Sequence, residues 1–204
     1  MYSNLKETIA EISKMEVSQE RKEVLQPLVD YIVQKTEENA LVRLNFICTH
    51  NSRRSHLTQI WAHTMAFYFQ IKNIDCYSGG TEATAMFSKV AETLSKQGFQ
   101  IQQLSEASNS VYAVKFTANE LPIICFSKVF DAAFNPNSEF AAIMTCSTAD
   151  EGCPFISGAE KRFPIRYDDP KAFDGTEMMD AKYAERSLEI AAEMHYVFSQ
   201  IKNK

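Results

Sequence analysis

Apolar positions recur along the chain with two different periods, which predicts strands followed by helices. Three short apolar runs are typical of buried strands: residues 41–47, 74–80 and 140–145. Apolar side chains recur at helical spacing in three further segments: residues 57–68, 86–94 and 179–201. Strands that alternate with helices indicate an α/β domain with a mostly parallel sheet of about four strands flanked by helices.

Two regions lie outside this alternation. Residues 1–40 have two amphipathic segments, the second opening after Ser18, and predict a helical extension packed on the domain. Pro27 is expected to kink the second segment or to lie near the start of a new helix. Residues 111–116 and 122–128 predict a hairpin across a turn-like connection.

The composition indicates a globular protein and argues against partners such as membranes and nucleic acids. The chain has 204 residues, of which 45% are hydrophobic and 23% charged, as expected for one globular domain. It has no apolar run long enough to span a bilayer, and its charged first residues do not resemble a signal peptide, so we expect a cytoplasmic protein. The net charge is −5 and no stripe of Lys and Arg occurs, so neither nucleic acid nor a membrane is an expected partner.

The cysteines raise the first chemical possibility. There are five of them, and an odd number in a reducing compartment argues against a disulfide framework. Most free cysteines are buried apolar residues, and we expect Cys76 and Cys125 to lie in the core. Cys48 and Cys146 differ because each directly follows a predicted strand. The carboxyl ends of parallel strands form the ligand-binding edge of such sheets.

The segment from Cys48 to Ser55 combines a cysteine, five intervening residues and Arg54 between a predicted strand and a predicted helix. A tight loop that enters a helix directs backbone N–H groups inward and can bind an oxyanion, and the helix dipole adds positive charge. The same field favours a nucleophilic thiolate at Cys48. Arg54 can bind two oxygens side by side, Ser55 can donate to the sulfur, and Asn51 can brace the loop. The expected oxyanion-binding residues are therefore Thr49, His50, Asn51, Ser52, Arg53, Arg54 and Ser55.

Several segments together resemble the low-molecular-weight protein tyrosine phosphatases and the arsenate reductases that share their fold. The matching segments are FICTHNSRRS (46–55), YSGGTEAT (77–84), TCSTADEGCP (145–154) and YDDP (167–170). The resemblance covers most of residues 42–200. It implies a domain over residues 41–204, with residues 1–40 as an extension and an insertion at about 102–139.

Cys146 and Cys153 flank a short polar segment, STADEG, which we expect to be a mobile loop. Their spacing resembles the redox relay of thioredoxin-coupled arsenate reductases. The resemblance implies that Cys48 forms an arsenic adduct and that Cys146 attacks Cys48 to release arsenite. Cys153 would then attack Cys146, and thioredoxin would reduce the resulting disulfide.

The reaction also needs a carboxylic acid that protonates the leaving oxygen. Asp169, directly before Pro170, matches the catalytic Asp-Pro of the family, with Asp168 and Asp174 as alternatives. The tyrosine phosphatases of this fold usually have adjacent tyrosines after the Asp-Pro, whereas this chain has Lys, Ala and Phe at 171–173. This departure favours arsenate reductase over the phosphatase alternative, in which water hydrolyses a phosphocysteine. A third hypothesis is a non-catalytic oxyanion or redox sensor.

Other departures concern the loop and its neighbours. His50 replaces the usual Gly and would be strained if the position required a positive φ. Arg53 replaces a second Cys and is expected to strengthen anion binding. Gln59 replaces a Glu that helps to bind potassium in some arsenate reductases, so no metal site or cofactor is expected. Ser78 is expected to support the loop. Two histidines of the following helix are expected to face solvent or to make local bonds: His56 and His63.

Overall fold

Three of the four strands of the main sheet are the predicted apolar runs. The computed structural model describes residues 1–152 and 155–202. Four parallel strands lie in the order β2-β1-β6-β7. They are β1 (Val42–Cys48), β2 (Ile74–Gly80), β6 (Phe140–Met144) and β7 (Ala159–Pro164). The expected α/β fold with a parallel sheet of about four strands is therefore confirmed.

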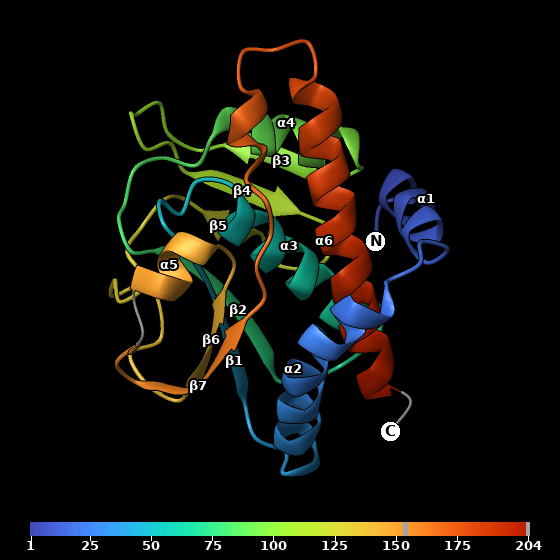
Figure 1. Ribbon diagram of the computed structural model, residues 1–204. Helices are drawn as coiled ribbons and strands as arrows, with labels where there is room; N and C mark the ends of the chain where they lie inside the picture. Colours follow the sequence, from blue (N-terminus) through green and yellow to red (C-terminus); the bar gives the residue numbers. More distant parts are fainter. Residues whose placement is uncertain (153–154, 203–204) are drawn as a thin grey trace.

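Helices cover the sheet and connect its strands. They are α1 (Ser3–Ile12), α2 (Gln19–Glu37), α3 (Arg54–Tyr68), α4 (Ser88–Lys96), α5 (Ser147–Gly152) and α6 (Met179–Lys202), with a 3-10 turn η1 (Pro170–Phe173). Helix α3 packs on β1, β2 and α6, whereas α2 contacts β1, β7 and α6. Helix α1 lies beside α6 (Figure 1). No helix in the described part of the chain has the length and apolar character needed to span a bilayer.

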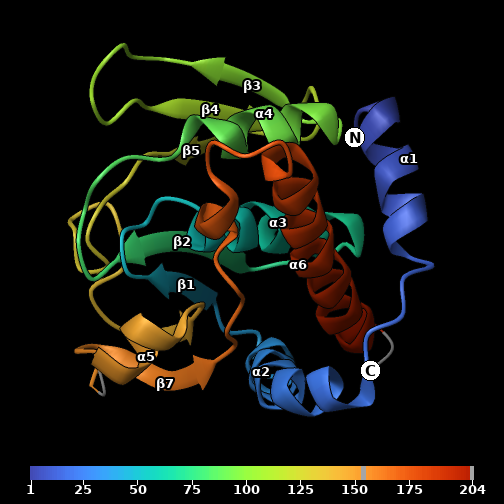
Figure 2. The ribbon, with the colours of Figure 1, turned by 45° about the horizontal axis from the view of Figure 1, so that its top comes forward.

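A second, antiparallel sheet has the order β3-β4-β5. Strands β4 (Tyr112–Lys115) and β5 (Ile123–Cys125) are the predicted hairpin, and β3 (Gln100–Gln103) is a third strand that the sequence pattern does not predict. In both ribbon views this sheet lies at the end of the molecule opposite to α2 (Figure 1 and Figure 2).

One expectation about local structure is wrong, and one of the two alternatives for Pro27 is excluded. The STADEG segment is not a loop but the helix α5, whose Asp150 is paired with Arg162 and Arg166. Pro27 does not begin a new helix, because α2 runs continuously from Gln19 to Glu37. Pro27 has no N–H to donate to the preceding turn, and because it lies on the exposed face of α2, the unpaired carbonyl of that turn can bind water.

Candidate active site

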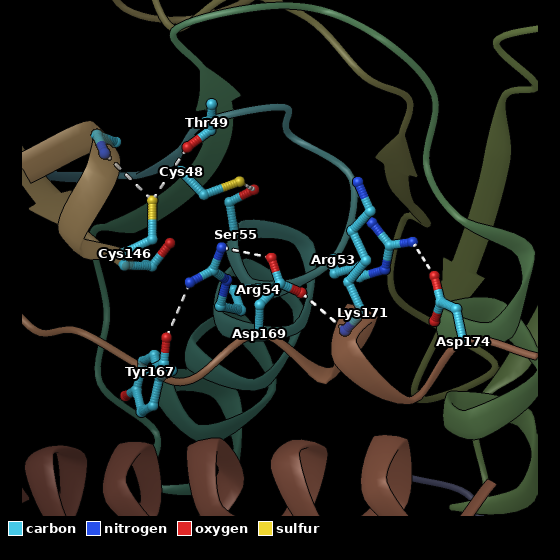
Figure 3. A network of polar contacts seen from close by, with 12 residues as sticks. Cys48, Thr49, Arg53, Arg54, Ser55, Cys146, Tyr167, Asp169, Lys171 and Asp174 are labelled. Carbon is cyan, nitrogen blue, oxygen red and sulfur yellow. Dashed lines mark hydrogen bonds and ion pairs between the residues drawn. The ribbon is translucent and has the colours of Figure 1, made fainter. Parts of the chain in front are cut away.

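The Cys48 loop lies at the carboxyl edge of the main sheet. Cys48 is the last residue of β1, and Arg54 is the first residue of α3. Cys48 pairs in register with Gly80 of β2, and Cys146 follows the end of the neighbouring strand β6. The alternation of strand, loop and helix therefore brings Cys48, Arg54 and Cys146 to one end of the sheet (Figure 3).

The carbonyl groups of the loop point outward. The Thr49 carbonyl accepts a hydrogen bond from the Glu82 N–H at 2.8 Å, and the Ser52 carbonyl accepts one from the Phe87 N–H at 3.0 Å. In the part of the chain that the structure describes, the N–H groups of residues 49–53 donate to no backbone carbonyl. A loop with outward carbonyls and free amides can bind an anion, as the sequence predicts.

Neighbouring segments brace the loop tightly. Asn51 has a φ of 44°, and its side chain donates to Ser55 Oγ at 2.9 Å and accepts from the Lys128 N–H at 2.9 Å. A Cβ atom on Gly80 would lie 2.6 Å from the Thr49 carbonyl oxygen, so this close approach requires glycine. The positive φ falls at Asn51 and not at His50, so His50 does not carry the strain considered above.

The Cys48 sulfur lies 3.1 Å from the Ser55 hydroxyl oxygen, and only 3% of Cys48 is exposed. Because Ser55 Oγ accepts from the Asn51 side chain, its own O–H is free to donate to the sulfur. A hydroxyl donor stabilises a thiolate and also stabilises the same sulfur when it leaves a covalent adduct.

Arg54 reaches across the mouth of the loop to the segment that follows β7. Its Nη2 pairs with Asp169 Oδ2 at 2.6 Å, and its Nη1 donates to the Tyr167 carbonyl at 2.9 Å (Figure 3). Of the three acid candidates, Asp169 is the one that contacts Arg54. The side chain of Asp168 is 97% exposed, and Asp174 is held by another arginine, Arg53.

The charge of Arg53, which is expected from the sequence to strengthen anion binding, is paired with other side chains in this structure. The guanidinium of Arg53 turns away from the loop and pairs with Asp174 at 2.6 Å. Its Nε donates to the Tyr183 hydroxyl at 2.5 Å, and its Cζ lies 4.3 Å from the centre of the Phe87 ring. A carboxylate therefore faces this charge, and the backbone N–H of Arg53 stays directed to the loop without a backbone acceptor among the described residues.

A second thiol lies beside the loop. Cys146 is fully buried directly before α5, and its sulfur lies 3.4 Å from the Thr49 hydroxyl oxygen. The Ala149 N–H donates to the same sulfur at 3.4 Å, so Cys146 caps the first turn of the helix (Figure 3). Cys153, the expected third member of the relay, lies outside the described residues.

The remaining sequence candidates form the support of the site. The hydroxyl of Ser78 lies 3.2 Å from Nδ1 of His56 on α3, the helix that follows the loop. His56 is fully buried, so the expectation that it faces solvent is wrong, although the local bond is present. Cys76 and Cys125 lie in the core, where burial raises the pKa of both thiols, that of Cys125 to about 12.

Burial lowers the pKa of His56 to about 3, from an ordinary value of 6.5. The unfolded chain therefore takes up a proton below pH 6.5 that the folded protein does not bind, and stability is lost as the pH falls. We expect the free energy of unfolding to fall by about 1.4 kcal/mol per pH unit on account of this group. Urea unfolding between about pH 7 and 4.5 measures this slope.

The matched variant is His56→Gln, a neutral side chain that can still bond with Ser78. We expect its stability to fall less steeply with acid than that of the wild type. If the free energy of unfolding fell equally steeply with acid in the two proteins, His56 would not be the group responsible for this pH dependence.

Several partners of the site have no signal in the sequence. Tyr167 contributes a backbone carbonyl, and Lys128 a backbone N–H, which any residue type could provide. Asp174 and Tyr183 meet Arg53 from 121 and 130 residues away along the chain. Only the tertiary fold brings these groups together.

Comparison with known proteins identifies the fold. No protein-family model and no curated protein matches this chain. Among solved structures, a low-molecular-weight phosphotyrosine phosphatase from Vibrio cholerae O395 has a TM-score of 0.51 at 15% identity, over 78% of this chain and 94% of that one. A YwlE mutant from Bacillus subtilis has a TM-score of 0.53 at 14% identity, over 79% and 99% of the two chains. A YwlE arginine phosphatase with a phosphorylated active-site serine has the same TM-score at 12% identity, over 80% and 97%.

Proposed function

We propose that this chain, which has the fold of the low-molecular-weight phosphatases, is an enzyme that reduces arsenate to arsenite. In this proposal Cys48 is the nucleophile, the loop amides and Arg54 bind the oxyanion, and Asp169 is the acid. Cys146 and Cys153 are the relay. The observation that supports it most is the second buried thiol, Cys146, whose sulfur lies 3.4 Å from the hydroxyl of the residue after Cys48.

The first step is an attack of the Cys48 thiolate on arsenic. An As–O bond breaks, and the oxygen leaves as water after it takes the proton of Asp169. The amides of residues 49–53 and the guanidinium of Arg54 stabilise the charge on the remaining oxygens. Ser55 then holds the sulfur as it becomes a leaving group.

The second step is an attack of the Cys146 thiolate on the Cys48 sulfur. The S–As bond breaks, and its electron pair stays on arsenic, which is reduced from As(V) to As(III) and leaves as arsenite. Two thiols are oxidised to a Cys48–Cys146 disulfide. Cys153 then displaces Cys48 from Cys146, and an external dithiol such as thioredoxin reduces the last disulfide, which suits the reducing cytoplasm.

A coupled assay tests the proposal. Arsenate is supplied with thioredoxin, thioredoxin reductase and NADPH, and the consumption of NADPH is followed in the wild type, in Cys146→Ser and in Cys153→Ser. Of these three proteins, we expect only the wild type to turn over arsenate. Cys76→Ser is the control, because it makes the same change at a core thiol.

Phosphate ester hydrolysis is the second candidate, because the solved structures with TM-scores above 0.5 include phosphatases. In that case water cleaves a phospho-Cys48 intermediate, and the relay cysteines are not needed. Rapid hydrolysis of an aryl phosphate that is unchanged in Cys146→Ser and Cys153→Ser, together with no arsenate turnover, would select it over arsenate reduction.

A further inference from the structure

Two consecutive arginines at the start of α3 hold two carboxylates of one segment. Arg54 pairs with Asp169, directly before η1, and Arg53 pairs with Asp174, directly after it. The two guanidinium groups diverge from the end of the loop toward these carboxylates (Figure 3). The segment that carries the proposed acid is therefore fixed at both of its ends.

The Arg53 end is closed, and two of its three members are largely buried. Arg53 donates to Tyr183 and to Asp174, and the Tyr183 hydroxyl donates to the second oxygen of Asp174 at 2.6 Å. The side chain of Arg53 is 10% exposed, and Tyr183 is fully buried. Asp174 keeps 26% of its side chain exposed, but each of the three groups bonds to the other two, and such a closed triangle has little freedom to reorganise.

The Arg54 end is different because its partner has to compete with the substrate. Nη2 of Arg54 binds Asp169, and Nη1 binds the Tyr167 carbonyl. A tetrahedral oxyanion that binds side by side on the guanidinium needs two of its donors, which weakens the hold on Asp169. The carboxylate of Asp169 then keeps the local bond from the Lys171 N–H. Its position also depends on the Arg53–Asp174 pair at the other end of the segment.

We propose that Arg53 is a positioning residue for the acid. With Asp174 and Tyr183 it forms an anchor that keeps η1 and Asp169 at the mouth of the loop while Arg54 turns to the oxyanion. This inference rests on the proposed roles of Cys48, Arg54 and Asp169. It assigns a function to the arginine that departs from the usual loop sequence of the family.

If Arg53 acts as this anchor, its replacement should change kcat without changing oxyanion binding, and the two can be measured separately. In Arg53→Gln the loop amides and Arg54 remain, so oxyanion binding is retained, whereas the acid is less well placed. We expect kcat for arsenate to fall by about tenfold to a hundredfold. Protection of Cys48 from iodoacetamide by inorganic phosphate is expected to have an unchanged half-saturation concentration.

Companion variants separate the anchor from a general loss of folding. Asp174→Asn removes the carboxylate partner of the same ion pair, and we expect it to lower kcat by a similar factor. The double variant is expected to be no worse than either single one. Arg53→Lys, which keeps the charge opposite Asp174, is expected to recover part of the rate. Arg43→Gln is the matched control, because it breaks an arginine–glutamate pair far from the site and is expected to keep the wild-type kcat.

The outcomes distinguish the anchor from the function on which it rests. If the wild type turns over neither arsenate nor an aryl phosphate, the proposed function is wrong and the anchor falls with it. If the wild type turns over and Arg53→Gln keeps its kcat, only the anchor is wrong. A weaker protection by phosphate in Arg53→Gln with an unchanged kcat would instead assign Arg53 to oxyanion binding and overturn the inference.

Discussion

Replacing Cys48 by serine is expected to lower kcat on the order of 10⁴- to 10⁶-fold. A serine hydroxyl is not ionised near neutral pH, and among the described residues the hydrogen-bond partner of the Cys48 side chain is the Ser55 hydroxyl, which is not a base. The amides of the loop and Arg54 are unchanged, so oxyanion binding is retained. It is even expected to tighten, because the thiolate no longer repels the anion. Coupled turnover measures the first effect, and calorimetric titration with inorganic phosphate measures the second.

The control for this variant is Cys76→Ser. Cys76 lies on β2, and burial raises the pKa of its thiol, so it is not expected to be a nucleophile. We expect Cys76→Ser to keep most of the wild-type kcat. Turnover in Cys48→Ser at a wild-type rate, or an equal loss in both variants, would remove Cys48 from the centre of the mechanism.

The largest expected effect on stability is that of Glu193→Ala. Glu193 is 3% exposed, and its two oxygens accept from Nε and Nη2 of Arg21 at 2.6 and 2.8 Å. It also accepts the hydroxyl of Tyr167 at 2.8 Å. Its removal leaves a half-buried guanidinium and a buried hydroxyl unpaired, which is expected to cost about 3–5 kcal/mol. Urea unfolding of the variant measures the loss.

Glu160→Ala provides a matched comparison. Glu160 also binds one tyrosine and one cation, Tyr31 at 2.6 Å and Lys35 at 2.7 Å, but its side chain is 32% exposed. Water can replace the lost partners there, so we expect a cost of about 1 kcal/mol or less. Equal costs at Glu193 and Glu160 would show that burial is not what makes the first network important.

The network around Glu193 also gives the N-terminal helices a connection to the site. Arg21 is on α2, Glu193 is on α6, and the carbonyl of Tyr167 accepts from Arg54. The sequence predicts the two N-terminal helices from their periodicity, but it does not predict this connection. We therefore expect Glu193→Ala to reduce turnover as well as stability.

The elements that the sequence predicts well are those with a strong apolar pattern. Strands β1 and β6 are largely buried on both faces; β6 is wholly apolar, and β1 is apolar except at Arg43 and Asn45. Helices α3 and α6 have apolar residues at helical spacing. The Cys48 loop follows from the same logic, because a strand, a polar stretch and a helix lie in direct succession.

The elements that the sequence does not predict are stabilised by contacts from elsewhere. Strand β7, with the sequence AEKRFP, is polar because it is an edge strand, and β3 is polar and largely exposed. The six residues of α5 are too few for a periodic pattern, and the Cys146 sulfur and two arginines stabilise this helix. The direction of the Arg53 side chain depends on Asp174, which no local pattern connects to it.

The segment after β5 holds the Cys48 loop from outside the main sheet. Ser127 donates its hydroxyl to the His50 carbonyl at 2.8 Å, Lys128 donates its N–H to Asn51, and the Lys128 carbonyl accepts from Gly80. A shortened chain that joined β2 directly to β6 would keep the whole Cys-x5-Arg sequence and yet lose these three restraints. Transplanting the motif onto a smaller scaffold therefore transfers the chemistry only if an equivalent outer support goes with it.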